Sequence, residues 1–227
     1  MLPVVLSSAA DSGFTVWLGL FDYINPICYT IFSIIGFKYF RKMMKPGFFY
    51  TYLVGCIISL IGGFFIPTIK TLVGLGVIEW SLPVSKVIIA NTGFLISGPT
   101  LFIGTLKKFR AEEIPENTVT AHSVGIGAAS LAFLNKFIVG FGALGMIMIY
   151  VTCAKLAIEK KRYYAVITLV ISLCGTLFES VFSNSGADLN AAWVHWVIEI
   201  GAVITHLMLV VSGYLLFIYK DKKTYTE

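Results

Sequence analysis

Hydrophobic residues follow one another along this chain in long runs that few polar residues interrupt. A run of about 20 apolar residues is long enough to cross the hydrocarbon core of a bilayer as an α-helix. A helix of a soluble protein instead keeps a polar face, so polar residues recur in it with each turn. The pattern therefore predicts membrane-spanning helices. The plain runs are residues 14–37, 48–67, 83–106, 137–158, 163–182 and 191–219.

A further stretch, residues 118–135, is harder to assign because it is only moderately apolar and is rich in Gly, Ala and Ser. Small residues let helix backbones approach closely, which suits a helix that is buried among its neighbours. Two alternatives are that this stretch enters the membrane and returns on the same side, or that it lies flat on the surface.

The basic residues favour a full crossing at residues 118–135. Of the 17 Lys and Arg residues, 14 fall in four clusters. Basic loops remain on the cytoplasmic side of a membrane, so an even number of crossings must separate each cluster from the next. Between the second and third clusters, only a crossing at residues 118–135 makes that number even. The clusters are Lys38/Arg41/Lys42/Lys45, Lys107/Lys108/Arg110, Lys155/Lys160/Lys161/Arg162 and Lys220/Lys222/Lys223.

We therefore expect an all-α, polytopic integral membrane protein with seven transmembrane helices in a cell or cytoplasmic membrane. Its amino terminus would lie outside and its carboxyl terminus in the cytoplasm. Residues 1–227 would form a single transmembrane domain, because seven spans with short loops nearly exhaust the chain. Spans 1–3 and 5–7 would begin on the same side, as in a parallel 3+1+3 repeat. Seven alternating helices produce the same layout without any repeat, and no known family is identified from these residues.

The composition agrees with this fold class. Hydrophobic residues make up 57% of the chain and charged residues 13%, with a net charge of +5. Soluble proteins carry about 25% charged residues. The basic excess is already explained by the topology, so it does not indicate a nucleic-acid partner. The expected partners are the lipid bilayer and a small solute or ion, and a homo-oligomer or a larger membrane complex stays open.

Ionisable residues inside the predicted spans are the candidates for function, because a charge in hydrocarbon is costly and by default marks a functional site. At about 1.5 Å of rise per residue, Asp22, Asn91 and Glu199 each lie roughly 12 Å below the outer edge. Glu179 and His195 lie in the same outer half of the membrane. The predicted binding site for a substrate or ion comprises Asp22, Asn25, Asn91, Glu179, His195 and Glu199.

Two features of this predicted site have structural explanations as well. Its three carboxyl groups share no buried base in the same layer, although Lys86 is near enough to pair with one of them. The structural alternative is that the three carboxyl groups are protonated and only form hydrogen bonds between helices. Pro26, next to Asn25, removes a backbone hydrogen bond and bends or opens the helix close to Asp22.

The leading functional hypothesis is a membrane transporter or channel for a cation or a small polar solute. An acidic cavity that faces outward attracts and concentrates cations, and buried carboxyl groups carry protons across membranes. This hypothesis requires no cofactor. It favours transport over catalysis, and no catalytic residue is assigned.

Two other classes stay open. A membrane-embedded metal hydrolase would use His195, Glu199 and Asp188, which are weak candidates for zinc ligands. Zinc needs three protein ligands around one ion. His206 cannot join His195, because 11 residues of helix separate them by about 16 Å. A haem-binding subunit would instead use a possible inner pair, His122 and His206. In an accessory subunit of a larger complex, the polar groups would only hold a partner.

Overall fold

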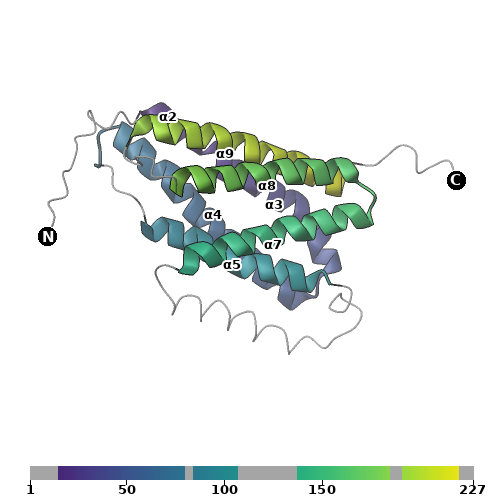
Figure 1. The fold of residues 1–227 in the computed structure, drawn as a ribbon. Helices are drawn as coiled ribbons and strands as arrows, with labels where there is room; N and C mark the ends of the chain where they lie inside the picture. The colour runs from purple at the N-terminus through teal and green to yellow at the C-terminus, as the bar shows by residue number, and fades with distance from the viewer. Residues whose placement is uncertain (1–14, 80–83, 107–136, 185–190, 220–227) are drawn as a thin grey trace.

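The computed structural model describes residues 15–79, 84–106, 137–184 and 191–219, and the regular elements in these ranges are helices (Figure 1). The predicted fourth span, residues 118–135, lies outside the described residues, as do His122 and Asp188. The described part of the chain is thus all-helical, in agreement with the fold class expected from the sequence.

Each of the plain apolar runs forms a helix. The first run is divided into α2 and α3, and the last run continues from α9 into a short π-helix. The helix bounds are α2 Val16–Asp22, α3 Ile24–Met43, α4 Pro46–Gly74, α5 Val84–Gly104, α7 Phe137–Glu159, α8 Tyr163–Asn184, α9 Ala192–Gly213 and η3 Tyr214–Ile218. The largest extensions beyond the predicted runs are those of α3, which continues past residue 37 to Met43, and of α4, which continues past residue 67 to Gly74.

Several of these helices have the length and apolar composition of membrane spans. Among the described residues, four stretches qualify: Val16–Met43, Pro46–Gly74, Gly142–Glu159 and Ala192–Ile218. Two shorter apolar helical stretches, Ile89–Gly104 and Tyr163–Glu179, accompany them. These lengths and compositions indicate an integral membrane protein.

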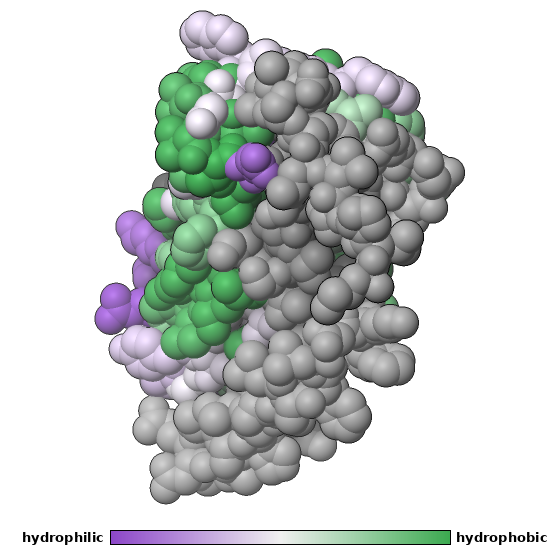
Figure 2. Space-filling view, turned by 90° about the vertical axis from the view of Figure 1, so that its left-hand side faces the viewer, coloured by the Kyte–Doolittle hydropathy of each residue, from purple (hydrophilic) through white to green (hydrophobic). Residues whose placement is uncertain are grey.

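The outward surface of the helices is apolar, as lipid requires. On α4, exposed side chains recur at helical spacing, namely Tyr50, Val54, Ile57, Ile61 and Phe65. The opposite face of this helix is buried; it carries aromatic residues near the start of the helix and small or polar residues such as Gly55, Ser59 and Lys70 farther along. This arrangement is the reverse of a soluble amphipathic helix. Figure 2 shows hydrophobic residues over much of the surface that is not drawn in grey, with hydrophilic residues in small separate groups.

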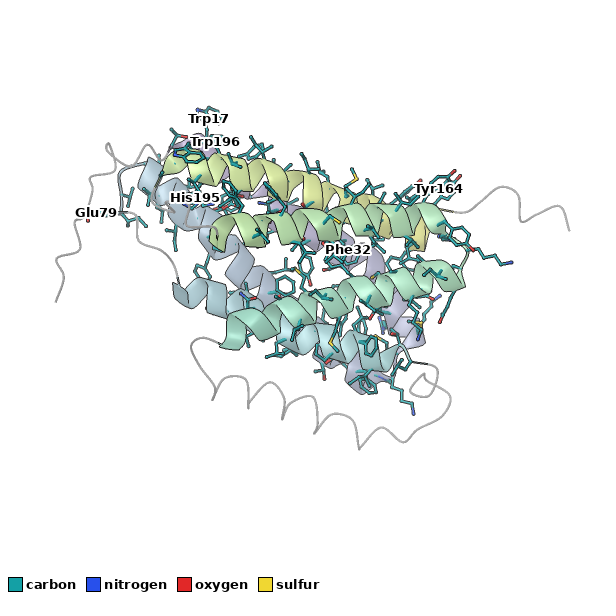
Figure 3. The ribbon with its side chains drawn as sticks, in the orientation of Figure 1. Trp17, Phe32, Glu79, Tyr164, His195 and Trp196 are labelled. Carbon is teal, nitrogen blue, oxygen red and sulfur yellow. The ribbon has the colours of Figure 1, made fainter. Side chains whose placement is uncertain are left out.

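Exposed aromatic residues mark both ends of the bundle. Trp17 and Tyr164 are exposed at opposite ends (Figure 3). Trp193, on the first turn of α9, and Tyr214, at the start of η3, are exposed as well. Along α9 and η3, the distance from Trp193 to Tyr214 is about 32 Å at ~1.5 Å per residue. The hydrocarbon core of a bilayer is about 30 Å thick, and Trp and Tyr are enriched at its two interfaces. The bundle therefore has the height of a membrane.

The helices pack in a closed sequence. Helix α4 contacts α3 and α5, α5 contacts α7, α7 contacts α8, α8 contacts α9, and α9 returns to α3. Glycines allow the closest approach: a Cβ atom on Gly98 of α5 would overlap the backbone of Gly145 on α7. Gly142 faces Asn91, and Gly145 faces Phe94, so contacts advance along both helices together. Helices α5 and α7 therefore run in the same direction and begin at the same end.

The basic residues at the end of α3 and between α7 and α8 gather at the end of the bundle farthest from Asp22. Lys38, Arg41 and Lys42 lie on the last turns of α3. Between α7 and α8, Lys160 Nζ lies 3.7 Å from the centroid of the Tyr39 ring, which is also near the end of α3. Arg162 Nη1 donates hydrogen bonds to the carbonyls of Leu215 and Leu216, at 2.8 and 2.7 Å. These contacts hold basic residues from separate clusters at one end.

Candidate functional site

The site begins at a break in the first helix. Pro26 has no N–H group, and its ring occupies the space beside the carbonyl of Asp22, four residues earlier. Helix α2 accordingly ends at Asp22, and α3 starts at Ile24. Asp22, which lies at this break, is buried in the bundle, with 6% of its surface exposed.

Tyr23, the residue at the break, is held by α4. Its hydroxyl lies 2.7 Å from Thr68 Oγ1. Thr68 uses its own hydroxyl hydrogen to bond the carbonyl of Phe64 at 2.7 Å. Tyr23 is therefore the donor in the first contact, and it fixes the interrupted helix against α4.

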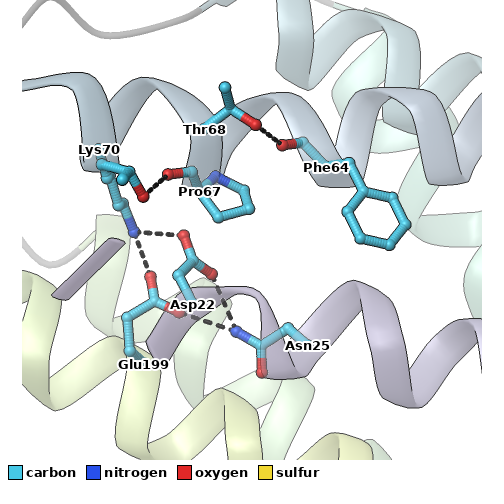
Figure 4. A network of polar contacts seen from close by, with 8 residues as sticks. Asp22, Asn25, Phe64, Pro67, Thr68, Lys70 and Glu199 are labelled. Carbon is cyan, nitrogen blue, oxygen red and sulfur yellow. Dashed lines mark hydrogen bonds and ion pairs between the residues drawn. The ribbon is translucent and has the colours of Figure 1, made fainter. Parts of the chain in front are cut away.

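A buried lysine joins three helices beside this break. Lys70 of α4 is only 2% exposed, and its Nζ lies 2.8 Å from Asp22 Oδ2. The same Nζ donates a hydrogen bond to Oε1 of Glu199 on α9, and Glu199 is 5% exposed. Figure 4 shows Lys70 between the two carboxylates. One ammonium group thus contacts acids from α2 and α9.

Asn25 closes the cluster from α3. Its Nδ2 donates to Asp22 Oδ1 at 3.0 Å and to Glu199 Oε2 at 2.8 Å, so both of its N–H groups are used (Figure 4). Its Oδ1 is buried and has no hydrogen-bond partner among the described residues. Lys70, Asp22, Asn25 and Glu199 therefore form a closed ring of contacts, called below the Lys70 cluster.

Lys70 corrects the expectation that the three acids share no buried base. That expectation assumed that the second span ended at Pro67, whereas α4 continues to Gly74. The signal was present in the sequence, because Lys70 stands among apolar residues after Pro67. Proline is tolerated in a membrane helix where other groups satisfy the backbone, and Thr71 Oγ1 donates to the Pro67 carbonyl at 2.8 Å. Lys86, the predicted partner, has a side chain outside the described part of the structure.

The Lys70 cluster is unbalanced in charge. It contains two carboxyl groups and one ammonium group. Burying ions is expensive unless they are paired and hydrogen-bonded. The cluster must therefore either carry one excess negative charge or hold one proton. Both states describe a site that accepts a positive charge.

A cavity of about 240 Å³ lies beside the Lys70 cluster. Asp22, Asn25 and Glu199 form part of its wall, and Glu179 of α8 and His206 of α9 form another part. Glu179 Oε1 is buried and has no hydrogen-bond partner in the described structure. The remaining wall is mainly apolar and includes Pro26, Leu60, Ile66, Phe94 and Ile198.

The structure thus brings some of the predicted site residues together and separates others. Asp22, Asn25 and Glu199 are in contact, and Glu179 lines the same cavity. Two predicted residues do not belong to the lining of this cavity. Asn91 packs against Gly142 of α7, and His195 is buried on α9 near the end where Trp17 and Trp196 lie (Figure 3).

The metal and haem alternatives depend on residues outside the described ranges. Asp188, the third weak zinc ligand beside His195 and Glu199, lies outside them, as does His122 of the possible inner pair. Within the described ranges, no group of three or more His, Cys, Asp or Glu residues is arranged to hold a metal ion. His206 lines the cavity, and its Nδ1 lies 2.7 Å from the carbonyl of Ala202.

No protein-family model, curated protein or solved structure matches this chain.

Proposed function

We propose that this protein is a membrane transporter or channel for a cation, or for a small polar solute whose movement is coupled to a cation or proton. The observation that carries the proposal is the Lys70 cluster at the wall of the cavity. The carboxyl groups of Asp22, Glu179 and Glu199 line this cavity. Lys70 contacts two of them, those of Asp22 and Glu199. Such a set attracts positive charge, and buried carboxyl groups are the usual carriers of protons in membranes.

The contacts suggest how a bound cation would act on the protein. A cation or proton that binds Asp22 or Glu199 competes with Lys70 for the same carboxylate oxygens. Because Lys70 links α4 to α2 and α9, weakening its ion pairs loosens the contacts among these helices. A ligand shifts a conformational equilibrium only through such a difference in contacts between two states. The break between α2 and α3 is the proposed point of movement, since interrupted helices line the sites of many transporters.

The proposal includes seven spans. Helices α5 and α7 begin at the same end of the bundle, so the chain between them has to return to that end. We propose that residues 118–135 make this return as the fourth span. The basic end would be cytoplasmic, which places the amino terminus outside, the carboxyl terminus inside and the cavity nearer the outer side. A 3+1+3 repeat fits these directions, although Pro26, Pro67 and Pro99 interrupt only the first three helices.

The test is a flux measurement on the full chain. Purified protein is reconstituted into liposomes, and uptake of radiolabelled sodium, rubidium and methylammonium is followed with and without an imposed proton gradient. We expect uptake of at least one of these cations above that of empty liposomes. Asp22→Asn and Glu199→Gln remove the negative charge at almost unchanged volume, so each should abolish that uptake.

Glu159→Gln is the matched control, because Glu159 is exposed at the end of α7. It should retain the wild-type rate. Protein-independent uptake of every cation in the panel, or wild-type rates in both Asp22→Asn and Glu199→Gln, would overturn the proposal and leave the Lys70 cluster as a structural contact between helices.

A further inference from the structure

We infer that the ligand of this cavity is a small compound that carries a primary ammonium group on an apolar body. This inference rests on the proposed function, because it names the class of cation that the cavity admits.

The orientation of Asn25 decides which of its atoms is available to a ligand. The Nδ2 group donates to carboxylates of Asp22 and Glu199. The reverse orientation would place the amide oxygen against those two acids, which only accept hydrogen bonds. Asn25 Oδ1 is therefore directed away from them. It is buried without a partner in the described structure, in a residue that is 8% exposed and lines the cavity.

Glu179, Ser59 and His206 also offer acceptors in the wall. Glu179 Oε1 is a buried oxygen with no hydrogen-bond partner among the described residues. Ser59 uses its hydroxyl hydrogen to bond the carbonyl of Ala90 at 3.2 Å, so lone pairs remain. His206 Nδ1 must donate to the carbonyl of Ala202, because a carbonyl only accepts, and this leaves Nε2 as the acceptor of the neutral ring.

A wall of acceptors calls for a ligand rich in donors. Leaving a buried acceptor without a partner costs free energy, so the empty positions on Asn25 and Glu179 favour a group that brings several N–H bonds. A primary ammonium group has three N–H donors and a positive charge. It also matches the excess of carboxyl groups around the cavity.

The remainder of the wall favours an organic body over a bare metal ion. Hard metal cations are usually surrounded by six or more oxygen ligands, whereas most of this lining is hydrocarbon. Phe94 and Tyr29 lie edge to face with their centroids 5.4 Å apart, and both rings line the cavity. At about 30 Å³ per water-sized group, the cavity holds roughly eight such groups. That volume suits a compact amine.

The test uses phenethylamine hydrochloride and two analogues on purified full-length protein in detergent, with binding followed by calorimetry. The trimethylated ammonium analogue keeps the charge and the ring but has no N–H donors. Phenethyl alcohol keeps the ring and one donor but has no charge. We expect phenethylamine to bind. Each analogue should bind at least about tenfold more weakly, because each lacks charge-assisted hydrogen bonds.

Two variants locate the ammonium group. Glu179→Gln should weaken phenethylamine binding about tenfold, whereas the exposed control Glu159→Gln should leave it unchanged. If Glu179→Gln does not fold, the comparison among the three ligands on the wild-type protein still decides the matter. Equal affinity for the amine and its trimethylated analogue would overturn the inference, and so would no binding of the amine.

The outcomes separate this inference from the proposed function. Sodium or rubidium uptake that depends on Asp22, together with no amine binding, would reject the inference and keep transport. Amine binding that depends on Glu179, together with no flux of any cation in liposomes, would keep the inference and reject transport.

Discussion

At the scale of single residues, the ion pairs of the site depend on one buried lysine. Lys70 neutralises part of the charge of Asp22 and Glu199 and ties α4 to both acids. Asn25 supplies the remaining donors. Removing one member of a buried ion pair is more damaging than removing both, because the remaining charge stays buried without a partner.

Lys70→Met should therefore destabilise the protein, by about 3–5 kcal/mol as for other broken buried pairs. The measurement is thermal unfolding of purified protein in detergent. Lys42→Met, on an exposed position near the end of α3, is the control and should melt close to the wild type.

Adding Glu199→Gln to Lys70→Met should recover part of the lost stability, because the double variant buries one carboxylate fewer. Equal melting temperatures for Lys70→Met and Lys42→Met would contradict the role of the ion pairs that Figure 4 shows.

At the scale of helices, prolines position the site. Pro26 separates α2 from α3 next to Asp22. Pro67 lies inside α4 one turn before Lys70, and the four-residue spacing of helical hydrogen bonds places its unmet carbonyl at Gly63, which lines the cavity. A Cβ atom built on Gly63 would lie 3.5 Å from Pro26 Cβ. The two interruptions therefore face each other across the wall of the cavity.

Pro26→Ala restores an N–H group that can bond the Asp22 carbonyl and so favours one continuous helix. An interior proline costs about 3 kcal/mol, so this variant should be at least as stable as the wild type. Its cation uptake in liposomes should fall, because the proposed point of movement is lost.

Pro99→Ala is the matched control for Pro26→Ala, because Pro99 lies inside α5 and outside the cavity lining. It should keep wild-type uptake. Normal uptake by Pro26→Ala would show that the break serves packing alone.

At the scale of the whole molecule, the distribution of charged residues agrees with the proposed orientation of the helices in the membrane. The basic residues at the end of α3 and between α7 and α8 share one end of the bundle, while the Lys70 cluster lies toward the other end. Along α9, Glu199 is six residues beyond Trp193. At ~1.5 Å per residue, it lies about 9 Å farther into the bundle than this exposed tryptophan. The cavity is thus within the thickness of the membrane and close to one interface.

The proposed orientation predicts which residues are accessible from each side. In a Cys174→Ala background, the native cysteines that remain among the described residues are buried. Lys161→Cys, between α7 and α8, and Glu79→Cys, after α4, then each add one exposed thiol at opposite ends of the bundle. A membrane-impermeant maleimide added to intact cells should label Glu79→Cys. It should label Lys161→Cys only after the membrane is opened. Labelling of both thiols in intact cells, or the reverse pattern, would contradict the orientation.

The helices themselves were predictable from sequence because hydropathy is a local property. Each plain apolar run became a helix, and the errors lie at ends such as that of α4. Asp22, Asn25 and Glu199 were also recognisable, since a polar residue in an apolar run is visible without knowing its neighbours. The full seven-span arrangement and the function of these residues stay predictions.

Tertiary structure alone decided which polar groups meet. The rotation and register of each helix depend on contacts such as Gly98 against Gly145, which no single helix contains. Packing brought Lys70 to Asp22 and Glu199 across 129 residues of sequence from the latter, and it placed Asn91 against α7 instead. The chain's own pattern therefore determined where helices form and which groups are costly to bury. Which residues pair with these polar groups was decided only by helix packing, because the atoms that offset the cost of burying them belong to other helices.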